Sequence, residues 1–115
     1  MQYLKNKTKK RRIRHPDSIL HRKDGTCYLC MAINNDFRLH AYVEAHHVFP
    51  GAAGRRVSEE NGLKVWLCRA HHRDSAAAVH RNHDNMLLIQ QDAQKAFLRT
   101  RTMQEWMRTV GRNYI

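Results

Sequence analysis

Alternating apolar and polar side chains predict a strand near the middle of the chain. In residues 37–43, Phe37, Leu39 and Val43 share one phase of the alternation, which is typical of a half-buried strand. The strand is expected to continue through residues 46–49 and to end at the Pro-Gly pair that follows.

A second strand is predicted about 20 residues later. Residues 63–67, Leu-Lys-Val-Trp-Leu, form a short apolar run directly before Cys68. Residues 52–62 contain two glycines and an asparagine and are expected to be a connecting loop, with one helical turn at most, at residues 58–60.

Helical patterns dominate the remainder of the chain. From Arg69 onward alanines are frequent, which favours helix. A longer helix is expected from Asn85 to about residue 99, with Asp84 as its N-cap. Residues 102–105, Thr-Met-Gln-Glu, match a capping box and predict a last helix that stops at Gly111. Two strands, a helix rich in possible metal ligands and a helical tail make a small α+β domain.

Excess positive charge is concentrated at the N-terminus. The 115 residues carry a formal net charge of +11, and residues 1–23 hold nine Lys or Arg against one acid. Release of counterions would favour binding of this segment to a polyanion such as DNA. Residues 1–20 are therefore expected to form a flexible basic arm that precedes a domain of residues 21–115. The expected phosphate contacts of the arm are Lys9, Lys10, Arg11 and Arg12.

The composition excludes several classes of protein. No stretch approaches the roughly 18 apolar residues of a membrane span, and the N-terminus has no apolar signal region. Three cysteines, an odd number, argue against a disulfide framework and favour metal binding in a reducing compartment. We therefore expect a cytoplasmic protein without a membrane partner.

The spacing of cysteine and histidine predicts one closed zinc site. Cys27-x2-Cys30 supplies two thiolates from one tight turn, and Cys68-x2-His71 repeats the spacing with an imidazole. Zinc prefers four tetrahedral sulfur and nitrogen ligands, and this Cys3His set uses every cysteine in the chain. The alternative is three buried, inert cysteines.

The remaining histidines of this region predict a second, open metal site. Catalytic metals have few protein ligands, so that water or phosphate can enter. Because neighbours on a strand point to opposite faces, His46 and His47 should not both bind one ion; one can bind metal while the other acts as a base. The alternative is a set of surface or core histidines. The candidates are His46, His47, His72, His80 and His83.

Together these residues resemble the HNH endonuclease family, the ββα-metal nucleases with a treble-clef-like core. The matching segments are residues 27–30, residues 44–51 (Glu-Ala-His-His-Val-Phe-Pro-Gly) and residues 63–72. A narrower similarity, to small zinc-containing phage and prophage HNH proteins, extends through Val-His-Arg-Asn at residues 79–82 to the final Gly-Arg-Asn-Tyr-Ile. The resemblance implies a metal-dependent endonuclease that hydrolyses DNA phosphodiester bonds, as a nickase or a double-strand cutter.

The resemblance also implies roles for single residues. His46 and His72 would bind a catalytic divalent ion (Mg²⁺, Mn²⁺, Ni²⁺ or Zn²⁺), beside the structural Zn²⁺. His47 would be the general base that deprotonates water, and the product would carry a 5′-phosphate. An imidazole titrates near working pH, as such a base requires. DNA as the partner, a phage or recombination protein as a second one, and the bacterial nucleoid as the location follow from the same resemblance.

Two departures from the family pattern concern the zinc turn and the middle Asn. His71 stands where cysteine is common, which zinc tolerates. The family's Asn falls on Leu63, so that Asn61 is the nearest candidate to orient His47.

A third departure concerns the last ligand of the open site. On a continuous helix His80 would lie about 12 Å beyond His72, too far to share an ion. Either the helix breaks near residues 74–75 and His80 is the ligand, which we favour, or water or His83 takes the position.

Charged residues beside the predicted site have two interpretations each. Glu44 could orient an imidazole, but a surface position on the strand is favoured slightly. The arginines could meet phosphates or form a solvated basic surface; they are Arg55, Arg56, Arg69, Arg73 and Arg81. The alternative functions are a noncatalytic zinc-stabilised nucleic-acid-binding module and a structural adaptor of phage machinery.

Overall fold

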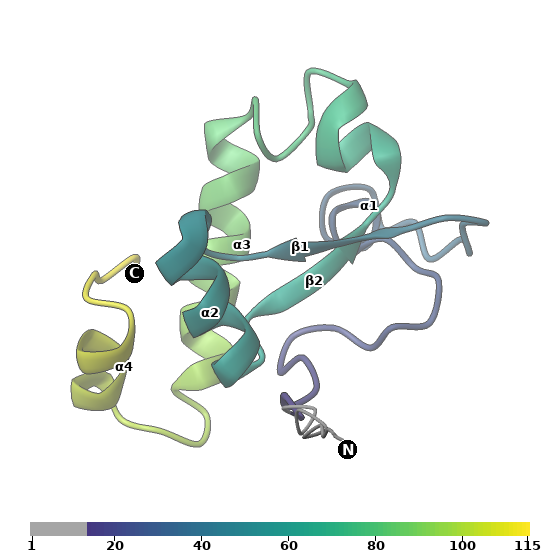
Figure 1. Ribbon diagram of the computed structural model, residues 1–115. Coiled ribbons are helices and arrows are strands. Elements are labelled where there is room, and N and C mark those ends of the chain that lie inside the picture. The colour runs from purple at the N-terminus through teal and green to yellow at the C-terminus, as the bar shows by residue number, and fades with distance from the viewer. Residues whose placement is uncertain (1–13) are drawn as a thin grey trace, which may run out of the picture.

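The computed structural model describes residues 14–115, so the arm residues Lys9, Lys10, Arg11 and Arg12 lie outside the described part. Figure 1 shows a small α+β arrangement in which helices surround two strands that run side by side. This confirms the predicted fold class at the level of an α+β domain. The elements are α1 (Tyr28–Asn34), β1 (Glu44–His47), α2 (Gly51–Asn61), β2 (Lys64–Leu67), η1 (Ala70–Asp74), α3 (His83–Phe97) and α4 (Met103–Thr109).

The two strands form an antiparallel pair in which Glu44 opposes Leu67 and His47 opposes Lys64. β2 was predicted from its apolar run and is confirmed. The strand predicted at residues 37–43 is wrong, since β1 begins only at Glu44. Phe37 is 63% exposed, and no strand within the described part of the chain lies opposite residues 37–43, because β2 is only four residues long. An alternating pattern without a partner strand does not make a sheet.

The segment between the strands is the helix α2, so the loop predicted for residues 52–62 is wrong. Two glycines with positive φ, Gly51 and Gly62, stand at its ends, and the interior is mostly Ala, Arg and Glu. These residues favour helix, and Gly62 ends it in the left-handed conformation that glycine adopts easily. α2 contacts β1 and leads the chain back to β2 (Figure 1).

After Cys68 the chain makes one wide helical turn, η1, and then breaks as predicted. Ser75 is extended, with φ −131° and ψ 172°. The Val79 amide then donates to the carbonyl of His71 at 2.6 Å, which folds the chain back on η1. His80 therefore lies on a loop, and the helical spacing that would separate it from His72 does not apply.

The last two helices close the core. α3 begins two residues before the predicted start, because the Asn82 side chain, not that of Asp84, caps it by accepting from the Asn85 amide at 3.0 Å. The capping box that begins α4 is confirmed. Trp106 of α4 is completely buried, and its ring centre lies 5.2 Å from that of Phe97.

Hydrogen bonds connect the described part of the N-terminal segment to the residues around the start of β2. The Ile19 amide donates to the Gly62 carbonyl at 2.9 Å, and the Ser18 hydroxyl donates to the Lys64 carbonyl at 2.5 Å. The last residues of the predicted arm thus lie against the start of β2. Among residues 14–115, no helix is long and apolar enough to cross a membrane.

Candidate metal centres and active-site cleft

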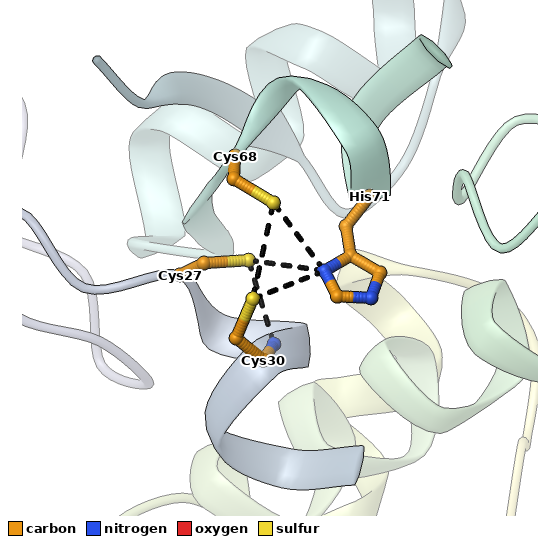
Figure 2. A group of neighbouring side chains, drawn as sticks. All are labelled: Cys27, Cys30, Cys68 and His71. Carbon is orange, nitrogen blue, oxygen red and sulfur yellow. Dashed lines mark hydrogen bonds between the residues drawn. The ribbon is translucent and has the colours of Figure 1, made fainter. Parts of the chain in front are cut away.

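Four side chains from two distant segments converge at the start of α1. Cys27 and Cys30 come from that helix and its N-cap, and Cys68 and His71 follow β2, as Figure 2 shows. The Nδ1 atom of His71 lies 3.5, 3.3 and 3.4 Å from the sulfurs of Cys27, Cys30 and Cys68. The sulfurs of Cys30 and Cys68 are 3.9 Å apart. The sequence did not predict α1, but it did predict this set of four residues.

These separations match the edges of a tetrahedron around zinc. With Zn–S bonds of about 2.3 Å and a Zn–N bond of about 2.0 Å, sulfur and nitrogen are about 3.5 Å apart and two sulfurs about 3.8 Å apart. Each of the four residues is at most 8% exposed. The buried cluster of Cys27, Cys30, Cys68 and His71 could therefore hold a structural metal such as zinc.

The electrostatics of this cluster also fit a cation. Burial raises the pKa of the Cys27 and Cys30 thiols, so that without a positive partner they stay protonated. A divalent ion reverses this by stabilising the thiolates. Burial lowers the pKa of His71, which keeps its imidazole neutral and able to bind metal.

A second cluster joins three imidazoles from three segments. His46 lies on β1, His72 in η1 and His80 on the loop before α3. One nitrogen of each lies within 4.8 Å of one nitrogen of each of the others. His83, the alternative third ligand, is instead the first residue of α3.

The ring positions in this second cluster also fit a metal ion. The ring centres of His46, His72 and His80 are 5.2 to 5.6 Å apart. An ion about 2.0 Å from each nitrogen lies about 3.2 Å from each ring centre, so tetrahedral angles would space the centres by about 5.2 Å. Right-angled octahedral positions would bring them to about 4.5 Å. These three histidines could therefore hold a metal ion.

The buried side chain of His46 is the most unusual member of this cluster. It is 3% exposed, and its Nε2 atom has no hydrogen-bond partner among residues 14–115. A buried polar atom without a partner is unfavourable by about 1–3 kcal/mol. Burial lowers the pKa of His46 to about 3, with help from His80 and His72, so its imidazole is neutral and has a free lone pair.

Glu44 lies beside this cluster and is buried, at 8% exposure, so the favoured surface position is wrong. Its carboxylate accepts hydrogen bonds from His72 Nδ1 at 2.6 Å and from the Tyr42 hydroxyl at 3.0 Å. The Arg73 guanidinium donates to both oxygens and, with His72, lowers the pKa of Glu44 to about 2. Arg73, a predicted phosphate contact, is thus paired with a carboxylate.

His47 points to the other face of β1, as the strand geometry predicted. It lines a cleft of about 760 Å³ together with Arg14, Arg55 and Arg56. Its Nε2 atom lies 2.6 Å from a carboxylate oxygen of Glu59. The two arginines of α2 therefore line the same cleft as His47.

The structure does not bring Asn61 to His47. The Asn61 amide donates to the Val57 carbonyl, and its oxygen accepts from Arg101, both at 2.9 Å. Glu59 has the place beside His47 that was expected for Asn61. Glu59 is not among the residues predicted from the sequence, because a loop is expected at residues 52–62, whereas the helix α2 turns Glu59 toward β1. Arg69, another predicted phosphate contact, pairs with Asp74 at 3.3 Å on the surface.

Comparison with protein-family models, curated proteins and solved structures found no match for this chain.

Proposed function

We propose that this chain is a metal-dependent endonuclease of the HNH type that hydrolyses DNA phosphodiester bonds in the bacterial cytoplasm. The observation that carries the proposal is the pairing of two adjacent histidines on opposite faces of β1. His46 belongs to the cluster of three imidazoles, and its buried Nε2 atom has no hydrogen-bond partner among residues 14–115. His47 faces a cleft lined with arginines.

A divalent ion at His46, His72 and His80 would act as a Lewis acid toward a phosphate oxygen. Three imidazole ligands suit this purpose, because they leave a coordination position for substrate. In a purely structural site a fourth protein side chain would complete the coordination. The first cluster has such a set of four, His71 and the three cysteines.

His47 is the proposed general base. Hydrogen bonds from His47 and Lys64 outweigh burial and lower the pKa of Glu59, so its carboxylate is ionised and can only accept. The proton of the neutral imidazole then lies on Nε2, and Nδ1 is free to take a proton from water. Arg14, Arg55 and Arg56 would hold phosphates of the DNA in the cleft.

The test is cleavage of a supercoiled plasmid by the full chain with Mg²⁺, Mn²⁺, Ni²⁺ or Zn²⁺. We expect His47→Ala to reduce nicking about 10²- to 10⁴-fold, the usual contribution of a general base. His83→Ala is the matched control and should nick like the wild type. If His47→Ala and the wild type nick equally, the proposal fails. DNA binding without cleavage under every metal would favour the noncatalytic zinc module instead.

A further inference from the structure

We infer that Glu44 is a positioning residue that fixes which nitrogen of His72 faces the second metal cluster. The inference rests on the proposed function only in so far as that cluster takes a divalent ion. It concerns a contact between two described side chains, the carboxylate of Glu44 and Nδ1 of His72, 2.6 Å apart.

The hydrogen bonds around Glu44 determine which group holds the proton between Glu44 and His72. Arg73 donates to both oxygens of Glu44, and the Tyr42 hydroxyl donates to one of them. A carboxylate surrounded by three donors is ionised and only accepts hydrogen bonds. Nδ1 of His72 must therefore carry the proton, so Nε2 is the nitrogen with the free lone pair.

The position of Glu44 on β1 also determines the direction of the His72 ring. Glu44 and His46 are two residues apart on β1, so both project from the same face of the strand, and both are buried. His72 enters this face from η1, with its ring 5.6 Å from that of His46. With Nδ1 held by Glu44, the opposite side of the ring is directed to the other two imidazoles. One strand thus supplies both a metal ligand and the group that orients a second ligand.

Loss of Glu44 should weaken binding of an ion at the second cluster. Without Glu44, His72 could hold its proton on either nitrogen and could rotate, and only one of these arrangements binds metal. Removal of a carboxylate that orients a ligating histidine typically weakens metal binding about 10- to 100-fold. The contacts of Glu44 with Tyr42, His72 and Arg73 involve neither the cleft of His47 nor the cysteine cluster. Replacement of Glu44 should therefore change the binding of the second ion alone.

The test uses full-length protein that has its tightly held zinc and has been stripped of the second ion. Long-range ¹H–¹⁵N NMR of the imidazoles reports the proton position of His72, and calorimetric titration with Zn²⁺ reports affinity. We expect the Nδ1–H form in the wild type, its loss in Glu44→Ala, and about 10- to 100-fold weaker Zn²⁺ binding. Glu44→Gln keeps an acceptor oxygen and should lie between them. Glu60→Gln, an exposed carboxylate on α2, is the matched control and should match the wild type.

Two results would overturn the inference: an Nε2–H form of His72 in the wild type, or unchanged proton position and affinity in both Glu44 variants. The wild-type spectrum decides the first point even if a variant fails to fold. Failure of the proposed function is recognised separately: wild type that binds the ion and shows the Nδ1–H form, but does not cut DNA, leaves the role of Glu44 intact.

Discussion

His47 is held by Glu59, whose carboxylate oxygen lies 2.6 Å from Nε2 of the imidazole. Lys64, opposite His47 in the sheet, donates to both oxygens of the same carboxylate at 3.2 and 3.3 Å. The contact joins the helix α2 to the strand β1, and Lys64 of β2 supports it. The group that orients the proposed base is thus a carboxylate, which also stabilises the imidazolium formed when the base takes a proton.

Replacement of Glu59 should reduce DNA cleavage more than replacement of Asn61. We expect Glu59→Ala to lower the single-turnover rate of plasmid nicking about 10- to 1,000-fold, because the imidazole loses its fixed tautomer and orientation. Glu59→Gln, which keeps an acceptor, should lose less. Asn61→Ala should stay near the wild-type rate. A slow Asn61→Ala together with a normal Glu59→Ala would restore the assignment made from the sequence.

Loss of a cysteine from the Cys3His cluster should remove zinc and the cooperative fold together. We expect Cys68→Ser to release the tightly bound ion and to unfold without a sharp transition, since metal binding supplies folding free energy in small metal-stabilised domains. His71→Cys, which keeps four tetrahedral ligands, is the matched control and should retain zinc. Mass spectrometry measures the zinc content of each variant, and circular dichroism measures its thermal unfolding. A zinc-free Cys68→Ser protein with full helical content and a cooperative transition would contradict this expectation.

Removal of residues 1–13 should weaken DNA binding in a salt-dependent way. This segment holds six Lys or Arg and no acid. Each phosphate contact that is lost should make the plot of log K for DNA binding against log salt concentration less steep by about 0.9. The steepness should therefore decrease by up to about 5. The double variant of Arg55→Ala and Arg56→Ala, in the cleft, should reduce it by up to about 2. Fluorescence anisotropy at several salt concentrations gives the slopes, and an unchanged slope in the truncated chain would exclude the segment as a phosphate binder.

The two clusters of candidate metal ligands could be predicted because short-range spacing determines much of their geometry. Cys27-x2-Cys30 places two sulfurs on one turn whatever the remainder of the chain does, and Cys68-x2-His71 does the same. Prediction of the second cluster also depended on a break in the helix near residues 74–75, which allows His80 to approach His72. Ser75 adopts the extended conformation that this break needs.

The residues that orient the histidines could not be predicted in the same way. Glu44 and His72 are 28 positions apart, and Glu59 lies 12 positions from His47. Their contacts depend on how β1, α2 and η1 pack, which no local pattern records. The strand expected at residues 37–43 failed for a related reason. Alternation gives the faces of a strand, but a strand also needs a partner, and β2 is too short to provide one there.

The approach of the N-terminal segment to the end of α2 makes a last prediction at Gly62. Its φ is 66°, and a Cβ added there would overlap the carbonyl oxygen of Asp17. Gly51, at the other end of α2, has φ 80°, but no atom of residues 14–115 comes within 4 Å of an added Cβ. Both Gly→Ala variants should lose about 1 kcal/mol through the left-handed backbone.

Gly62→Ala should lose a further 1–3 kcal/mol or so, because it also forces residues 17–19 away from the strand. Urea unfolding of the zinc-loaded protein measures both losses, and amide exchange at Ile19, which donates to the Gly62 carbonyl, shows where the chain has moved. Equal destabilisation by the two variants, with exchange at Ile19 unchanged, would mean that residues 17–19 do not pack on Gly62 in solution.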